Sequence, residues 1–253
     1  MIKEKKVIII TGGAGRIGFN LAENLLKAGN KVVISDNNKN KLKYLKKKVL
    51  TKNLEIFKAD LTKKRDIDKL ISFSLKKFSR IDSMVCSAYP KSKKFGNNFE
   101  KLDEKSLKED LYNQLGSTII LSQRIIKYFL KAKSGNLIFI SSIQGLDSPK
   151  FEHYLGTKMN SPIEYSAAKS GIISVTKYLA KFYKNRNLRI NCVSPGGIRS
   201  NQPNLFVKKY RKSCNSKGLL DPQDVSNLIL FLISDKSKFI HGQNLVVDDG
   251  WSL

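Results

Sequence analysis

A tyrosine and a lysine four residues apart are the first candidates for chemistry in this 253-residue chain. Tyr165 and Lys169 lie in the segment Tyr-Ser-Ala-Ala-Lys, and on a helix such residues share one face. An ammonium group near a phenol favours the phenolate, and lowering a tyrosine pKa from about 10 to near 7 requires roughly 4 kcal/mol. Such a phenol exchanges protons at neutral pH. The pair also arises by chance on amphipathic helices, so its place in the chain decides its meaning.

A glycine-rich segment near the N-terminus is the second candidate. A β-branched run ends at Thr11, and the segment Gly-Gly-Ala-Gly-Arg-Ile-Gly then leads into an amphipathic stretch. Glycines between a strand and a helix let the backbone approach a pyrophosphate, and the helix N-terminus offers N–H groups and partial positive charge. We predict dinucleotide contacts from Gly12, Gly15, Arg16, Ile17 and Gly18. The alternative is a tight glycine turn without a ligand.

Acidic residues after the second and third predicted strands suit the adenosine half of a dinucleotide. The carboxylate of Asp36 is placed to accept hydrogen bonds from both ribose hydroxyls and to repel a 2'-phosphate, which favours NAD over NADP. Nearby basic residues oppose that preference: Arg16, Lys39 and Lys41. Asp60 and Leu61 are less specific candidates for adenine-side contacts. The alternative for Asp36 is an aspartate that only begins a loop.

Seven short runs rich in β-branched residues alternate with longer amphipathic segments. The predicted strands are Lys6–Thr11, Lys31–Ser35, Leu54–Lys58, Ser83–Ser87, Leu137–Ser141, Arg189–Val193 and Asn244–Val247. Helical periodicity marks Ile17–Ala28, Leu107–Ala132, Ile163–Tyr183 and Val225–Ile233. Apolar strands that alternate with helices indicate a parallel sheet covered on both faces. We therefore predict an α/β, doubly wound (Rossmann) fold as a single domain over residues 1–253.

Two helix starts are predicted at proline-containing segments. In Ser161-Pro162-Ile163-Glu164 the serine is the expected N-cap, the proline the first helical residue and the glutamate the partner in a capping box. The segment Asp221-Pro222-Gln223-Asp224 repeats this arrangement. The first start places Tyr165 and Lys169 in the opening turns of a helix.

The net charge of +26, from 47 Lys and Arg against 21 Asp and Glu, raises the question of a nucleic-acid partner. The basic residues are scattered over nearly every predicted helix and loop, as in a lysine-rich solvated exterior, so no specific nucleic acid is expected. A salt-sensitive nucleic-acid binder stays a third alternative.

Three cysteines without metal-ligand spacing favour a reduced, cytoplasmic chain and no metal site: Cys86, Cys192 and Cys214. No apolar run suits a signal peptide or a membrane span, so no membrane association is expected.

The order of these motifs resembles the short-chain dehydrogenase/reductase family over nearly the whole chain. The matching positions are Thr11–Gly18, Asp60, Asn113 with Gly116, Ser141-Ser142, Tyr165–Lys169, Pro195-Gly196, Gly242-Gln243 and Asp248–Gly250. The resemblance implies an NAD(P)-dependent oxidoreductase that interconverts a secondary alcohol and a ketone. In such enzymes the cofactor carries the hydride, and the protein supplies geometry and proton transfer.

The resemblance also implies a role for each matching residue. Ser142 would hydrogen-bond the substrate oxygen, and Tyr165 would be the acid/base. Lys169 would bind the nicotinamide ribose and lower the tyrosine pKa, and Asn113 would support a proton-relay water. The implied cofactor contacts beyond the glycine turn are Ala88, Tyr165, Lys169, Pro195, Gly196, Ile198 and Ser200, the last two at the carboxamide.

Two positions depart from the family's common pattern. Arg16 stands where a glycine is usual, and the spacing of the remaining glycines fits the longer, sugar-nucleotide branch of the family. Cys86-Ser87-Ala88-Tyr89 replaces Asn-Asn-Ala-Gly, which removes a structural asparagine and puts an aromatic ring near the ribose or the substrate entrance. A catalytically inactive dinucleotide-binding regulator or scaffold is therefore the alternative function.

Ser142 and Tyr165 are 23 residues apart, more than is common in the family, so an insertion lies within Asp147–Ser161. Substrate loops are expected at 89–100, 144–162 and 198–220. Their basic residues suggest an anionic, polar substrate, the alternative being the general lysine excess: Lys91, Lys93, Lys94, Lys150, His153, Lys158 and Arg199.

The insertion, the stretch Ser194–Ile198 and the ending Val247–Leu253 resemble a narrower subgroup, the flagellin-modification protein A type of surface-glycan oxidoreductase. That resemblance implies a sugar or activated-sugar substrate. The apolar faces of the predicted helices 107–132 and 163–183 resemble the family's subunit-pairing helices, which implies a homodimer or homotetramer.

Overall fold

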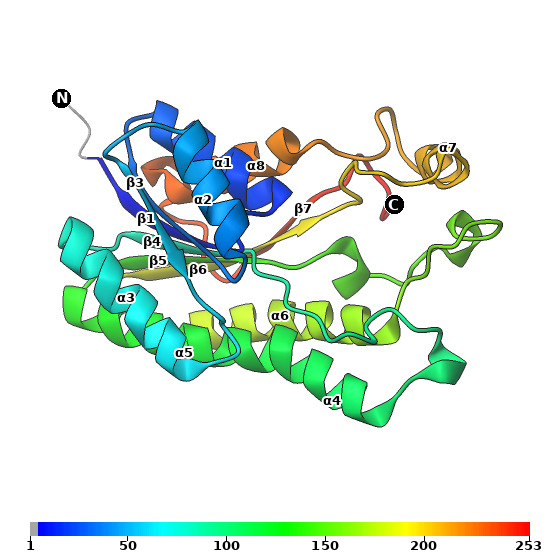
Figure 1. Cartoon of the computed structure of the whole chain (residues 1–253), viewed down its shortest axis with the longest axis horizontal. Helices are drawn as coiled ribbons and strands as arrows, with labels where there is room; N and C mark the ends of the chain where they lie inside the picture. The colour runs from blue at the N-terminus through cyan, green and yellow to red at the C-terminus, as the bar shows by residue number, and fades with distance from the viewer. Residues whose placement is uncertain (1–4) are drawn as a thin grey trace.

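The computed structural model describes residues 5–253, so the first four residues of the basic opening segment lie outside the described chain. Within these residues, seven parallel strands form one sheet in the order β3-β2-β1-β4-β5-β6-β7 (Figure 1). The strands are β1 (Val7–Thr11), β2 (Lys31–Asp36), β3 (Leu54–Lys58), β4 (Ser83–Cys86), β5 (Gly135–Ile140), β6 (Leu188–Pro195) and β7 (Asn244–Val247). All seven predicted strands are present, and the predicted doubly wound single domain is confirmed.

Helices cover both faces of the sheet (Figure 1). The helices are α1 (Arg16–Lys27), α2 (Lys39–Lys48), α3 (Lys64–Phe78), α4 (Glu104–Leu111), α5 (Ser117–Ala132), α6 (Ile163–Phe182), α7 (Asn204–Lys212) and α8 (Pro222–Ile233). One face carries α1, α2 and α8, and the other carries α3, α5 and α6. Ile9 packs with the second group, whereas Ile8 and Ile10 pack with the first. Strands buried on both faces must be apolar throughout, which explains the continuous hydrophobic runs of the sequence.

The chain winds from β1 out to β3 and then from β4 out to β7, so its direction reverses between β1 and β4. In open α/β sheets ligands bind outside the carboxyl ends of the strands at such a reversal. The turn after β1 and the segment after β4 meet there. This geometry places the glycine turn and Tyr89 beside one another.

The predicted helix 107–132 is helical throughout, but it begins earlier, at Glu104, and contains a π-helical turn, η2 (Tyr112–Gly116), between α4 and α5. The predicted cap of the helix after Ser161 is wrong. Helix α6 begins at Ile163 with Pro162 as its N-cap, and Ser161 does not cap it. The Ser161 hydroxyl instead donates to Gln144 Oε1 at 2.7 Å. Glu164 is buried and accepts from the Gly96 N–H at 3.2 Å, so tertiary contacts displace the predicted capping box.

The second predicted helix start is confirmed. Asp221 is the N-cap of α8, Pro222 follows it in the first turn, and Asp224 completes a capping box. The Asp221 N–H donates to the Asp224 carboxylate at 2.8 Å. Both carboxylates stay at the helix end, and Lys217 forms an ion pair with each of them.

Candidate active site

Ser142 and the tyrosine–lysine pair meet at the carboxyl end of β5. Ser142 follows the strand and begins a short 3-10 turn, η3 (Ile143–Gly145), which packs against α6. The neighbouring Ser141 hydroxyl donates to the Lys169 carbonyl at 2.7 Å and joins the strand end to the helix. Ser142 forms a side-chain hydrogen bond with Tyr165. Three of the four predicted catalytic side chains therefore form one cluster.

Burial controls the protonation of this cluster. Desolvation raises the pKa of Tyr165, although the hydrogen bond with Ser142 acts in the opposite direction. Desolvation also lowers the pKa of Lys169 to about 8, against a smaller opposing effect from Cys192. Lys169 Nζ donates to the Ile140 carbonyl at 2.9 Å and lies 5.5 Å from the Tyr165 ring centroid. Desolvation is thus the largest effect on the Tyr165 pKa, and the lowering of that pKa by Lys169 remains a prediction.

Tyr89 lies directly against the predicted acid/base. Its ring meets the Tyr165 ring edge-on, with centroids 5.3 Å apart and planes at 77°. Lys169 Nζ lies 5.4 Å from the Tyr89 centroid. Burial raises the pKa of Tyr89, and Tyr165, Asp110 and Glu164 raise it further. The sequence marked Tyr89 as unusual, but only the structure shows its contact with Tyr165 and Lys169.

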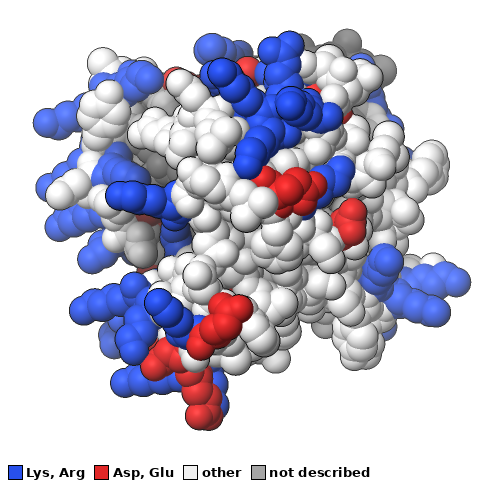
Figure 2. Space-filling view, turned by 90° about the vertical axis from the view of Figure 1, so that its right-hand side faces the viewer, with Lys and Arg blue, Asp and Glu red and all other residues white. Residues whose placement is uncertain are grey.

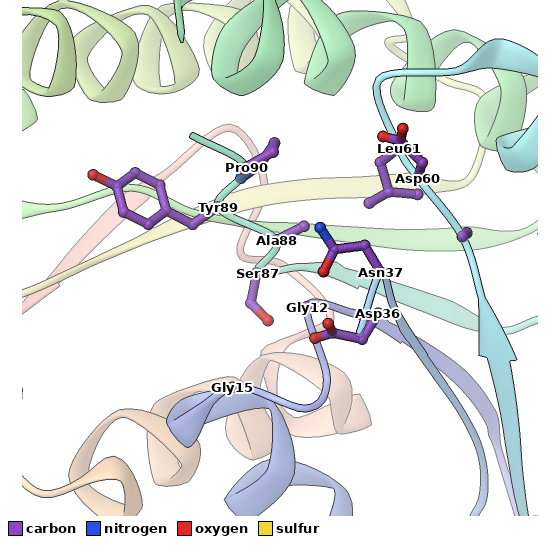
Figure 3. A pocket seen from close by; sticks show the side chains of 11 residues that line it. Gly12, Gly15, Asp36, Asn37, Asp60, Leu61, Ser87, Ala88, Tyr89 and Pro90 are labelled. Atoms are coloured by element: carbon purple, nitrogen blue, oxygen red, sulfur yellow. The ribbon is translucent and has the colours of Figure 1, made fainter. Parts of the chain in front are cut away.

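The turn after β1 forms one wall of a pocket that also receives residues after β2, β3 and β4 (Figure 3). Gly12 has a φ of +63°, and a Cβ there would lie 2.6 Å from Ala88 Cα, so only glycine fits. A Cβ on Gly15 would meet only the Gly12 oxygen, at 3.1 Å. Helix α1 has no side-chain cap at its N-terminus. The turn therefore leaves N–H groups and side-chain-free space at the pocket, as a pyrophosphate requires.

The adenosine side of the pocket contains the predicted acidic residues. Asp36 lines the pocket, and its carboxylate accepts from the Ala14 N–H at 3.2 Å and the Asn38 N–H at 3.0 Å. It thus both begins the loop and faces the pocket. Asp60 also lines the pocket; partial burial raises its pKa, but hydrogen bonds from Thr62 and Lys63 lower it overall. Leu61 and Ala88 complete this wall. The residue types fit an adenosine diphosphate moiety.

Other predicted cofactor contacts lie at the edge of this region. Arg16 Nη1 donates to the Arg199 carbonyl at 3.0 Å, so its side chain reaches the loop after β6. Ile17 packs into the apolar layer beneath α1, as does Ile198. Pro195 ends β6, and the following Gly196 N–H donates to the Val247 carbonyl. Ser200 is exposed, and its N–H donates to Gln202 at 2.6 Å. Their contacts with a cofactor remain predictions.

Asn113 lies in the π-helical turn η2, which packs against α6. Its carbonyl accepts a hydrogen bond from the Ser117 hydroxyl. Asn113 lines an outer cavity with Asp60 and Lys91 and does not line the pocket beside Gly12. The proton-relay role of Asn113 remains a prediction.

The insertion before α6 is packed against the C-terminal part of the chain. A short turn within it, η4 (Phe151–His153), contacts α7, and His153 lies among Phe206, Tyr210 and Trp251. Gln144 joins the insertion to the catalytic strand end, because its side chain donates to Tyr154 Oη at 3.1 Å and accepts from Ser161. No local sequence signal marked Gln144, since its role depends on partners ten and seventeen residues away.

The face at the carboxyl ends of the strands has Lys and Arg side chains along its edges and a largely uncharged centre (Figure 2). Several of the basic residues expected to attract an anionic substrate instead form hydrogen bonds or ion pairs with other residues of the chain. Lys150 donates to the Trp251 carbonyl at 2.8 Å, Lys94 pairs with Asp103 at 3.0 Å, and His153 contacts the Ser213 hydroxyl at 2.9 Å. Lys91 lies 5.3 Å from the Tyr89 ring centroid. The basic character of the rim is therefore weaker near the pocket than the residue count suggests.

Within residues 5–253, no group of three or more His, Cys, Asp or Glu side chains is arranged to hold a metal ion. The described helices also include none that combines the length and apolar character needed to cross a membrane. Cys86 and Cys192 are buried free thiols, and desolvation raises the pKa of Cys192 to about 12.

Known proteins are similar to this chain over nearly its whole length. A family model described as enoyl-(acyl carrier protein) reductase matches residues 12–252. Post-translational flagellin modification protein A of Campylobacter coli is 41% identical over 99% of both chains. The 7alpha-hydroxysteroid dehydrogenase of Bacteroides fragilis is 32% identical, covering 99% of this chain and 95% of that protein.

A solved short-chain dehydrogenase from Leptospira borgpetersenii with bound NAD+ superimposes with a TM-score of 0.87 and 30% identity, covering 99% of this chain and 94% of that one. The similarity covers the glycine turn, the strand ends and the tyrosine–lysine helix together. The chain belongs to the short-chain dehydrogenase/reductase family, whose members are oxidoreductases acting on CH–OH groups with NAD(P).

Proposed function

We propose that this protein is an NAD-dependent oxidoreductase that interconverts a secondary alcohol and a ketone on a polar, sugar-like metabolite. One observation carries the proposal. Tyr165 is hydrogen-bonded to Ser142 and lies 5.5 Å, measured at its ring centroid, from the Lys169 ammonium, beside a pocket with a dinucleotide-type turn. A proton donor, a second hydroxyl and a buried cation around one cleft suit the reduction of a carbonyl.

Each side chain has a distinct task in this proposal. The Tyr165 hydroxyl donates its proton to the carbonyl oxygen of the substrate, and Ser142 donates a hydrogen bond to the same oxygen. The raised pKa of Tyr165 keeps this donor protonated at neutral pH. Lys169 holds the nicotinamide ribose and supplies positive charge near the phenol. Asn113 supports a water that returns protons from solvent. Bound NADH supplies the hydride, and NAD+ accepts it in the reverse direction.

The preference for NAD rests on Asp36. Its carboxylate lines the pocket, where it suits ribose hydroxyls and repels a 2'-phosphate. The similar Leptospira dehydrogenase was solved with NAD+. The glycine turn, Asp60, Leu61 and Ala88 supply the remaining adenosine and pyrophosphate contacts.

A sugar or activated sugar of surface-glycan biosynthesis is the proposed substrate, with the loops 89–100, 144–162 and 198–220 around it. The relative from Campylobacter coli named for flagellin modification supports this class. We also propose a cytoplasmic homodimer or homotetramer. Exposed apolar side chains on and next to the expected pairing helices support self-association: Tyr112, Ile119, Tyr178 and Phe182.

Titration of the purified protein with NADH and NADPH tests the proposal first, with cofactor fluorescence as the signal. Micromolar binding with NADH preferred is expected. Tyr165→Phe is then expected to lower kcat to less than a tenth and to leave the NADH dissociation constant within threefold. A kcat above a tenth of the wild-type value would remove the acid/base role. Cofactor binding without turnover of any carbonyl would favour the inactive regulator or scaffold.

Sugar nucleotides and their uncharged sugars distinguish the substrate classes. We expect kcat/KM to be higher for the charged compounds at low and at moderate salt. Equal values for charged and neutral analogues at low salt would remove the proposed anionic character of the substrate.

A further inference from the structure

We infer that Tyr89 is a positioning residue whose aromatic ring holds Tyr165 and the Lys169 ammonium in their working arrangement. The inference rests on the proposed roles of Tyr165 and Lys169. Tyr89 occupies the position at which the family commonly has glycine, so no side chain is needed there for the fold itself. Its ring nevertheless contacts both members of the pair, at 5.3 Å from the Tyr165 ring and 5.4 Å from Lys169 Nζ.

The backbone before Tyr89 is held rigidly at the reversal point of the sheet. The Ser87 hydroxyl donates to the Thr11 carbonyl at 2.7 Å, and the Ser87 N–H donates to the same oxygen at 3.2 Å. Ala88 packs so closely on Gly12 that a Cβ on that glycine would clash with it. The direction of the Tyr89 side chain is therefore set by contacts with β1 and its turn. A ring on a fixed backbone can restrain its neighbours.

The loop after Tyr89 is attached to the catalytic helix. The Phe95 ring packs edge-on against Tyr89, with centroids 5.5 Å apart. The following Gly96 N–H donates to Glu164, which precedes Tyr165 on α6. The Asn160 side chain donates to the Gly96 and Asn97 carbonyls. Tyr89 thus joins the turn after β1 to the first turn of α6, where Tyr165 lies.

The Tyr89 ring also stabilises the charged form of Lys169, which desolvation destabilises. An aromatic face near an ammonium group favours the charged form, and the effect grows when water is excluded. The Lys169 ammonium lies within 5.5 Å of two tyrosine rings, Tyr89 and Tyr165. The titratable groups placed around it are these two phenols and the Cys192 thiol. Loss of the Tyr89 ring removes part of this support for the cation, whereas an apolar side chain in its place leaves the desolvation of Lys169 unchanged.

Three variants test the inference. Tyr89→Phe keeps the ring, Tyr89→Leu keeps apolar bulk without a ring, and Tyr44→Leu makes the same change at an exposed position on α2. We expect Tyr89→Leu to lower kcat about tenfold with the KM for NADH within threefold. We expect Tyr89→Phe and Tyr44→Leu to stay within threefold of wild type in both constants.

The pH profile of carbonyl reduction distinguishes positioning from general packing. Leucine keeps the site apolar but has no aromatic face, so the pKa of Lys169 falls and activity is lost at lower pH. We expect the alkaline limb of kcat to move down by about half to one pH unit in Tyr89→Leu and to stay in place in Tyr89→Phe. Thermal unfolding confirms that each variant is folded, and Tyr89→Met replaces Tyr89→Leu if that variant does not fold.

Three results would overturn the inference. An unchanged kcat and pH profile in Tyr89→Leu would show that the ring restrains nothing. Equal losses in Tyr89→Phe and Tyr89→Leu would assign the effect to the hydroxyl. A raised NADH dissociation constant with unchanged kcat would make Tyr89 a wall of the cofactor pocket only. Full activity of Tyr165→Phe would instead refute the proposed function, which keeps the two failures distinct.

Discussion

Alanine substitution at two glycines of one turn separates a requirement of the fold from a requirement of the cofactor. Gly12 combines a φ of +63° with a Cβ position 2.6 Å from Ala88 Cα. A left-handed backbone costs a non-glycine residue about 1–2 kcal/mol, and forced overpacking adds about 1–3 kcal/mol. We expect Gly12→Ala to lower the free energy of unfolding by about 2–5 kcal/mol.

Gly15 has an ordinary backbone, with a φ of −79°, and a Cβ there would meet only one oxygen of the chain, at 3.1 Å. We expect Gly15→Ala to change the free energy of unfolding by about 1 kcal/mol or less. The added methyl group would occupy space that we propose for the pyrophosphate. The NADH dissociation constant is therefore expected to rise at least about tenfold, which corresponds to about 1.4 kcal/mol of binding free energy.

Urea unfolding followed by circular dichroism and titration with NADH measure the two effects. Gly96→Ala is the matched control for backbone conformation, because Gly96 has a φ of +94° and a Cβ there would meet nothing within 4 Å. We expect Gly96→Ala to lower the free energy of unfolding by about 1–2 kcal/mol, and this change measures the cost of the left-handed backbone alone. Wild-type stability of Gly12→Ala would refute the close approach to Ala88. Wild-type NADH affinity of Gly15→Ala would refute the placement of the pyrophosphate at this turn.

Three further predictions follow from individual side chains. Asp36→Ser is expected to raise the affinity for NADPH relative to NADH at least about tenfold, since a repelling carboxylate is removed; an unchanged ratio in paired titrations would contradict this. Carbonyl reduction is expected to decline as pH rises through about 8, because the pKa of Lys169 lies there and its ammonium is lost above it; a kcat that stays constant to pH 9.5 would argue against a role for the cation. Trp251→Leu is expected to lower the free energy of unfolding by about 2–3 kcal/mol and to raise the substrate KM, because the buried indole stacks on Tyr210 and supports the insertion; thermal unfolding and substrate kinetics measure both effects.

Strand positions were predictable from the sequence because burial on both faces of a parallel sheet leaves a continuous apolar run. Ile8, Ile9 and Ile10 illustrate this, since alternate residues pack into opposite layers. The predicted helix 107–132 is present, but its sequence did not reveal the π-helical turn at Tyr112–Gly116. The wider turn adds about one residue, and apolar residues on both sides of it still recur every three or four positions.

The capping error at Ser161 has a different cause. Capping rules describe competition between a side chain and nearby backbone groups. At Asp221 the capping box is present, and the local rule holds. At Ser161 and Glu164 the side chains find distant partners, Gln144 and Gly96, which local spacing does not encode.

The amino-acid sequence by itself determined the fold class, the glycine turn, the acidic residue at the end of β2 and the tyrosine–lysine pair, because each depends on periodicity or on spacing within one or two elements. Only the tertiary structure decided how these parts act on one another. It buries Lys169 and partly buries Tyr165, so that desolvation shifts both pKa values, and it brings Tyr89 from another strand end against both side chains. Desolvation and ring contacts depend on three-dimensional packing between segments far apart in the chain, and residue spacing carries no measure of either.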